Sequence, residues 1–267
     1  MRRSAAVFLT GVLASVVSPQ ETSYSFEQEQ LSHARVQEAA KKDAAWRALF
    51  AQKNLHYPPR RVLLLAFKRE SILEVWSSDG DAQSYVRVKS LHICASSGQA
   101  GPKRHVGDGQ VPEGFYEIDQ FNPQSNFYLS LHVSYPNASD KILSSHGNPG
   151  GDIFVHGNCV TIGCLPITDD GIKEVYWLGV LARQAGEKRI PIWIFPRRLS
   201  DEGFRALAEQ HREQTDLVSF WGNLKEGYDV FEKEHKVPAI SVSSDGRYHF
   251  RYHAAWSAEQ IRQRHAD

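Results

Sequence analysis

The chain has 267 residues, of which 41% are apolar and 23% charged, an ordinary composition for a globular protein large enough for one sizeable domain. Lys plus Arg and Asp plus Glu both number 31, so the formal net charge is zero. A protein without excess positive charge has no general affinity for nucleic acid or anionic lipid, and we therefore expect no nucleic-acid partner.

Residues 1–18 are typical of an export signal. Arg2 and Arg3 are followed by the uncharged run Ala5–Val17 and then by polar residues from Gln20. The run is too short to cross a bilayer comfortably, and no other segment is apolar enough to do so. The sequence predicts an exported protein without a stable membrane span after signal removal. The alternative is an amphipathic or disordered N-terminus.

The three cysteines are Cys94, Cys159 and Cys164. An odd number in an exported chain leaves at least one thiol unpaired, and three are too few for a disulfide-stapled framework. A free thiol in an oxidising compartment is a liability unless it has a chemical role. We expect Cys94 to lie in the core on a strand and Cys159 to fill a small space.

The N-terminal part is expected to be a helical arm, residues 19–59. Ala, Gln, Glu and Lys dominate Glu27–Lys53, which predicts one helix, and Pro58-Pro59 ends the arm. The candidate buried positions of this helix are Leu31, Val36, Ala39, Trp46, Leu49 and Phe50.

A β-rich region follows, with loops at residues 96–112 and 136–151. Apolar runs and alternating patterns predict its strands. They are Val62–Phe67, Ile72–Trp76, Tyr85–Val88, Leu91–Ala95, Phe115–Ile118, Phe127–Tyr135, Asp152–Val155 and Ile190–Phe195.

Three helices and a hairpin are predicted toward the C-terminus. Ile172–Ala185 is the first helix, with Thr168 or Asp170 as its cap and Gly186 as its end. The other helices are Ser200–Arg212 and Leu217–His235, and a hairpin over Ile240–Tyr252 turns at Asp245-Gly246. These last elements form a predicted C-terminal extension, residues 199–267.

The segment from His156 to Thr168 carries the strongest chemical signal. A strand ends at His156-Gly157, and small residues then lead to Cys164 just before a helix. Only the thiolate is a good nucleophile, and a neighbouring imidazole can take the thiol proton. Backbone N–H groups near Gly163 could stabilise an oxyanion. The sequence therefore predicts a cysteine nucleophile.

Two other interpretations of this segment remain open. Cys164 could be an inert buried residue, with His156 a satisfied turn histidine. Alternatively, His156, Cys159 and Cys164 could bind zinc with His146 as a fourth ligand, although the spacing is loose for a structural site.

The order of several motifs resembles the YkuD-type L,D-transpeptidases. His156-Gly157 followed by Thr161-x-Gly163-Cys164 is similar to that family's signature, and Ser97-Gly98 and Val111–Ile118 are similar to its upstream segments. Four further segments resemble its YafK branch: Gly101-Pro102-Lys103, Phe121-Asn122-Pro123, Tyr135-Pro136-Asn137 and Ile194-Phe195-Pro196. The resemblance implies a catalytic domain at residues 60–198, mostly β with flanking helices (α+β).

The resemblance also implies the roles of individual residues. Cys164 is expected to be the nucleophile and His156 the general base and acid, with Gly163 in the oxyanion region. Thr161 takes the place usually held by serine, and the Gly157 carbonyl is expected to orient the imidazole. The expected substrate-binding residues are Lys103, Tyr135 and Asn137. No metal or cofactor is expected.

The family acts outside the cytoplasm on diaminopimelate-containing peptidoglycan, which implies a periplasmic enzyme whose partners are stem peptides. Ile162 stands where most members have histidine, and Pro166 where most have arginine. Both departures fit the YafK branch, whose known activity is hydrolytic and releases a lipoprotein joined by lysine to diaminopimelate. We therefore expect a Cys164 thioester that water or an amine resolves. The alternative is an inactive cell-wall-binding protein.

Overall fold

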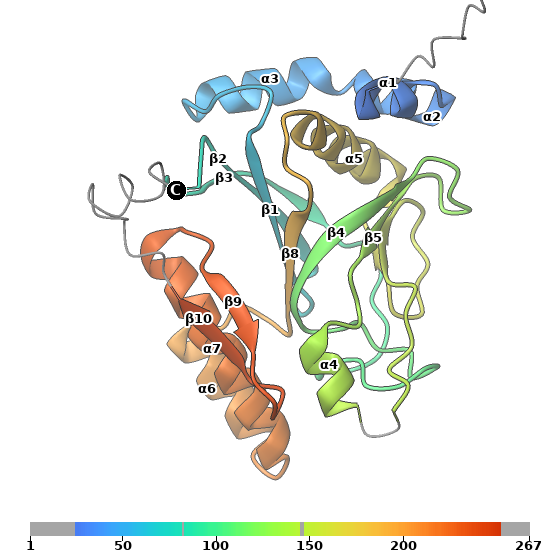
Figure 1. Cartoon of the computed structure of the whole chain (residues 1–267). Coiled ribbons are helices and arrows are strands. Elements are labelled where there is room, and N and C mark those ends of the chain that lie inside the picture. Colours follow the sequence, from blue (N-terminus) through green and yellow to red (C-terminus); the bar gives the residue numbers. More distant parts are fainter. Residues whose placement is uncertain (1–24, 82, 145–146, 252–267) are drawn as a thin grey trace, which may run out of the picture.

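The computed structural model describes residues 25–81, 83–144 and 147–251 (Figure 1). The predicted export signal and His146 lie outside these ranges. Within them, no helix is long and apolar enough to cross a membrane.

An eight-stranded mixed sheet forms the centre of the molecule. Its order is β3-β2-β1-β8-β4-β5-β6-β7, in which β1 with β8 and β6 with β7 are parallel neighbours and the other pairs are antiparallel. The strands are β1 Arg61–Phe67, β2 Ile72–Ser78, β3 Val86–His92, β4 Gly114–Asn122, β5 Ser130–Val133, β6 Phe154–His156, β7 Leu165–Pro166 and β8 Ile190–Phe195.

Both faces of the sheet are covered, which explains the continuous apolar run of β1. Alternate residues of a strand face opposite sides. Leu64 of β1 therefore joins the core cluster beneath the N-terminal helices and α5 (Thr168–Gln184), whereas Leu65 joins the cluster beneath the C-terminal helices. In Figure 1, α5 and the N-terminal arm lie on one side, and α6 and α7 on the other.

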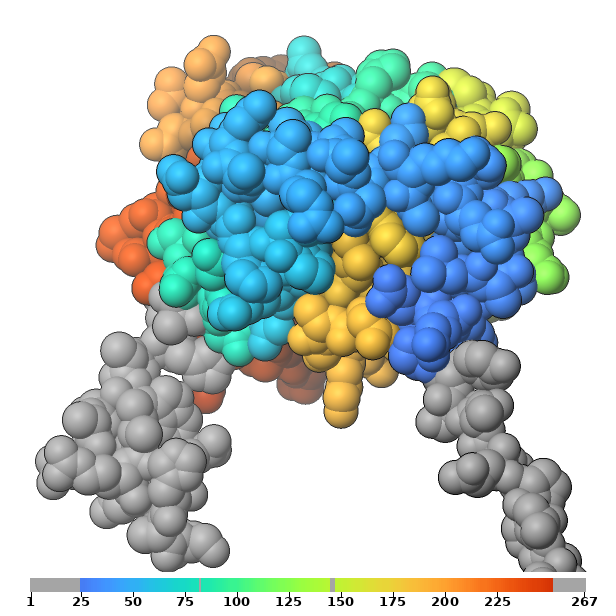
Figure 2. Space-filling model, turned by 90° about the horizontal axis from the view of Figure 1, so that it is seen from above, coloured from blue at the N-terminus to red at the C-terminus, as the bar shows by residue number. Residues whose placement is uncertain are grey.

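The N-terminal arm forms three short helices instead of the single predicted one: α1 Phe26–Leu31, α2 Ala34–Ala40 and α3 Asp43–Gln52. The chain turns at Ser32 and Lys41 so that each helix reaches α5. Tyr176 of α5 donates a hydrogen bond to the buried Gln30 side chain (2.5 Å), and Trp46 donates one to the Glu174 carbonyl (2.9 Å). Figure 2 shows the arm spread across this face, with α5 visible between its helices.

The C-terminal extension packs against the opposite face of the sheet. It contains α6 Asp201–Gln210, α7 Thr215–Glu234 and the hairpin β9 Ala239–Val242 with β10 Tyr248–Arg251. The buried stripe of α7 consists of Trp221, Leu224, Tyr228 and Phe231.

The α+β fold with flanking helices is confirmed, with several local corrections. The two strands predicted over 85–95 form the single strand β3, and the strand predicted over 127–135 is limited to β5. The loop predicted over 136–151 contains the short helix α4, Ala138–Leu143, whose capping box is formed by Asn137 and Asp140. The predicted division at residues 18, 59 and 198 stays a prediction.

Candidate active site

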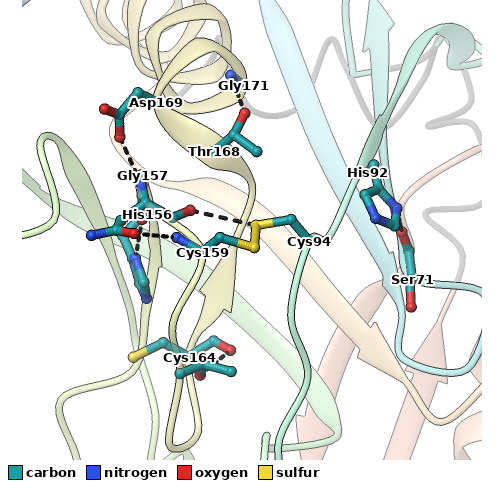
Figure 3. Close-up of a disulfide and its surroundings, with 12 residues drawn as sticks. Ser71, His92, Cys94, His156, Gly157, Cys159, Cys164, Thr168, Asp169 and Gly171 are labelled. Carbon is teal, nitrogen blue, oxygen red and sulfur yellow. Dashed lines mark hydrogen bonds between the residues drawn. A yellow bond between two sulfur atoms is a disulfide. The ribbon is translucent and has the colours of Figure 1, made fainter.

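His156 and Cys164 lie in and next to the neighbouring strands β6 and β7, respectively. His156 is the last residue of β6, and Cys164 immediately precedes β7, with Val155 paired to Leu165 and His156 to Pro166. Extending this register by one residue places Cys164 opposite Phe154. Side chains alternate along a strand, so Phe154 and His156 face the same side of the sheet. In Figure 3 the imidazole and the sulfur of Cys164 extend toward the same side of the connecting loop.

The His156 side chain is held by its own backbone neighbour. Its Nδ1 lies 2.6 Å from the Gly157 carbonyl oxygen, the contact that the sequence predicts for Gly157. A carbonyl can only accept, so Nδ1 carries the proton and Nε2 is left as the acceptor. The ring is buried beside Phe127, with the centroids 4.6 Å apart. Burial lowers the pKa of His156, partly opposed by the Gly157 carbonyl.

Cys164 is a half-buried free thiol whose Sγ lies 3.6 Å from the Asp152 carbonyl oxygen. Burial is the main cause that raises the pKa of this thiol above its ordinary value, while the Phe154 backbone N–H and the charge of Lys103 act in the opposite direction. Both environments therefore favour the uncharged forms of the thiol and the imidazole. If Cys164 acts as a nucleophile, its proton has to move.

Thr161 and Gly163 shape the turn that presents Cys164. The Thr161 hydroxyl donates to the Cys164 carbonyl (2.8 Å) and accepts from the Gly163 N–H (3.1 Å). Gly163 has a φ of +139°, which favours glycine, and a Cβ there would lie 3.1 Å from the Gln110 carbonyl oxygen. Among the described residues no acceptor engages the Cys164 N–H, so this amide can serve a developing oxyanion.

Comparison with known proteins places this chain in a family. No family model matches the chain. It is 35% identical over 189 residues to the protein named "Putative L,D-transpeptidase YafK" from Escherichia coli strain K12, and the match covers 70% of this chain and 72% of that protein. The same values hold for its counterpart in Escherichia coli O157:H7.

The chain belongs to the L,D-transpeptidase family. Among solved structures, it is similar to the helical cell shape determining protein Pgp2 from Campylobacter jejuni, with a TM-score of 0.40, 20% identity, and coverage of 69% of this chain and 73% of that one. Bd1075 from Bdellovibrio bacteriovorus has a TM-score of 0.38 and 20% identity, with coverage of 67% of this chain and 63% of that one.

The cysteine positions require a correction. Cys94 and Cys159 form a disulfide with a Cα–Cα distance of 5.6 Å, which is within the usual range (Figure 3). Cys94 lies just beyond β3 and is half-buried, and Cys159 is exposed, so neither is the packing residue that the sequence predicted. Two of the three cysteines pair, and Cys164 is the free thiol. An odd number of cysteines leaves at least one thiol unpaired.

The disulfide also removes Cys159 from the zinc ligand set considered with His156 and Cys164, because a disulfide sulfur carries no thiolate to coordinate the metal. Within the described ranges no cluster of three His, Cys, Asp or Glu side chains is suited to a metal. The fourth ligand considered, His146, lies outside those ranges.

Lys103 is buried and close enough to influence Cys164. Its Nζ donates to Asp108 Oδ1 (2.6 Å) and to the His105 carbonyl (2.8 Å). Burial alone would raise the pKa of Asp108, but Lys103 and three backbone N–H groups lower it to about 2. Lys103 therefore acts on the Cys164 thiol through its charge, as part of an ion pair. Contact with substrate stays a prediction.

Tyr135 and Asn137 use their polar atoms within the protein. The Tyr135 hydroxyl donates to the Pro149 carbonyl (2.9 Å). Asn137 caps α4, and its Nδ2 donates to the Phe115 carbonyl (3.0 Å) and to the Tyr248 hydroxyl oxygen (2.8 Å). These contacts give both residues a scaffold role, and a role in substrate binding stays a prediction.

Sequence reasoning missed three residues around the pair. Phe127 lies against the His156 ring, the Asp152 carbonyl faces the thiol, and Asp169 at the start of α5 accepts from the Asn158 N–H (2.7 Å). Phe127 acts through long-range packing and Asp152 through a backbone atom. Neither kind of contact leaves a sequence pattern. Only Asp169 had a local signal, because acidic residues are common in the first turn of a helix.

Proposed function

We propose that this chain is a cysteine acyl-transfer enzyme that acts on diaminopimelate-containing stem peptides of peptidoglycan. The observation that carries the proposal is the His156–Cys164 arrangement on adjacent strands, with Nδ1 of His156 bonded to the Gly157 carbonyl. That bond fixes the tautomer in which Nε2 can accept a proton. Family membership supports the substrate class.

The reaction begins from the neutral pair. As Sγ of Cys164 attacks the carbonyl carbon of a diaminopimelate residue, the thiol proton passes to Nε2 of His156. The C–S bond forms, and the carbonyl electrons move to an oxyanion that accepts a hydrogen bond from the Cys164 N–H. The C–N bond then breaks, His156 protonates the departing amine, and a thioester remains on Cys164.

Water or an amine can resolve this thioester, and we propose that water prevails. Transfer to an amine requires a bound acceptor and a site shielded from solvent. Pro166, where most relatives have arginine, is buried and paired with His156, and supplies no charge. Lys103 is already engaged by Asp108. Neither of these two residues therefore offers a free cation to anchor an acceptor stem.

The proposed location is the periplasm, after removal of the signal predicted at residues 1–18. The Cys94–Cys159 disulfide supports an oxidising compartment, because such bonds rarely persist in the cytosol. The proposed partners are stem peptides and a lipoprotein joined to them through lysine.

Product analysis on defined muropeptides tests this function. The enzyme is incubated with a tetrapeptide stem and with a stem carrying a lysine on diaminopimelate, and the products are identified by mass spectrometry. We expect hydrolysed stems with free lysine, and no product from the Cys164→Ala variant. Cross-linked dimers as the main product would overturn the preference for water. Binding without any product from wild-type enzyme would instead indicate an inactive cell-wall-binding protein.

A further inference from the structure

The Cys94–Cys159 disulfide joins the two edges of the central sheet. β3 and β7 are the outermost strands in the sheet order, yet the Cys94 N–H donates to the Pro166 carbonyl (2.9 Å). The sheet therefore curls until its edges meet beside the catalytic strands. The disulfide lies at this seam and links positions separated by 65 residues.

The same disulfide holds the loop between the two proposed catalytic residues. Cys159 lies between His156 and Cys164 in the chain, and its N–H bonds to the Asn158 side chain (2.6 Å). Val160 and Ile162 are 54% and 88% exposed, so hydrophobic packing contributes little to holding this loop. The loop depends on a few hydrogen bonds, including Asn158 with Asp169, and on one covalent bond.

We propose that the disulfide is a positioning element for Cys164, and that its reduction lowers turnover while the fold persists. The inference rests on the proposed function. Small displacements of a reacting group cost large factors in rate, because attack requires near-contact geometry. Cys159 is exposed, so a reductant can reach it. A dithiol supplies the two electrons and two protons that convert the disulfide to two thiols, and is itself oxidised to a disulfide.

The experiment compares the oxidised protein with protein reduced by dithiothreitol and freed of reagent. Three quantities are measured: kcat on a stem peptide, the far-ultraviolet circular dichroism, and the rate at which iodoacetamide alkylates Cys164, mapped by peptide mass spectrometry. We expect kcat to fall about 10-fold or more with an unchanged spectrum. Alkylation of Cys164 should become faster, because a released loop exposes a thiol that burial now protects. Oxidised glutathione should restore both values.

The matched variant is Cys94→Ser/Cys159→Ser, which should show the low kcat without reductant and no response to it. Equal kcat in both redox states of wild-type, or wild-type kcat in the double variant, would overturn the proposal. Loss of the folded spectrum on reduction would also overturn it, because the bond would then be a general stabiliser. If no form turns over stem peptide, the proposed function fails. The alkylation rate then decides: a change with redox state supports the inference, and no change overturns it.

Discussion

At the scale of single residues, the protonation of His156 and Cys164 determines how the proposed reaction begins. Burial lowers the pKa of His156 and raises that of Cys164, so both environments favour the uncharged forms. This differs from a preformed thiolate–imidazolium pair, in which each charge stabilises the other. In the proposed reaction, one proton moves from sulfur to imidazole as the substrate is attacked.

A pH profile follows from these directions. The proposed reaction requires neutral His156, so kcat/KM should rise with pH through a pKa below the ordinary value of 6.5. The midpoint of thiol deprotonation should lie above pH 9.0. The check is the pH dependence of kcat/KM together with that of Cys164 alkylation. A Cys164 thiolate detected at neutral pH would contradict the neutral pair. Both pH profiles are needed because interacting groups titrate together.

Gly163 offers a second test at this scale. Gly163→Ala places a side chain at φ +139° and 3.1 Å from the Gln110 carbonyl oxygen, which should distort the turn before Cys164. Gly186→Ala is the matched control, because Gly186 has φ +101° and no atom within 4 Å of an added Cβ. Both variants should lose about 1–2 kcal/mol of unfolding free energy, measured in urea, from the backbone strain.

Activity distinguishes the two glycine variants. Gly163→Ala should lower kcat by about 10-fold or more, since the nucleophile follows directly in the chain. Gly186→Ala should retain wild-type kcat, because it lies beyond the far end of α5. A fully active Gly163→Ala enzyme would show that this turn does not position the thiol.

At the scale of elements, a buried ion pair joins β1, the loop over 96–113 and α7. Lys68 directly follows β1, and its Nζ lies 2.8 Å from Glu113 Oε1, with their side chains 7% and 0% exposed. Lys68 also donates to the Gly101 carbonyl (2.9 Å), and Trp221 of α7 donates to Glu113 Oε2 (2.7 Å). The C-terminal extension therefore helps to hold the loop that contains Lys103 and Gln110.

Breaking this pair should be costly, because it leaves Lys68 buried without its counter-charge. Glu113→Gln should lower the free energy of unfolding by about 3–5 kcal/mol. Glu117→Gln, which removes the exposed ion pair with Arg189, should cost less than about 1 kcal/mol. Urea denaturation measures both. Equal losses in the two variants would mean that the buried pair does not hold the extension to the sheet.

Helices and strands could be predicted where neighbouring residues in the sequence determine them. Helix α7 and the final hairpin follow from periodicity and an Asp-Gly turn, which need only neighbouring residues. The arm was predicted as one helix because its composition favours helix throughout. Its breaks at Ser32 and Lys41 follow the surface of α5, to which Gln30 and Trp46 bond, and this surface lies far away in the sequence.

At the scale of the whole molecule, the sheet brings together residues that are distant in the chain. His156, Gly157, Gly163 and Cys164 were located by a short motif, because they share one strand–loop–strand unit. Cys94 comes from the opposite edge of the sheet order, so its pairing with Cys159 depends on the curl of the sheet. No local pattern encodes that curl. The sequence was therefore informative about the residues proposed to react and much less so about what holds them in place.

The central claim is that Cys164 forms a covalent acyl intermediate. The most direct measurement is mass spectrometry of the protein quenched in acid during turnover of a stem tetrapeptide, followed by peptide mapping. The account predicts an added acyl mass on the peptide containing Cys164, removable by hydroxylamine as expected for a thioester, and absent from Cys164→Ala. Turnover without any adduct, or with undiminished rate in Cys164→Ala, would contradict it.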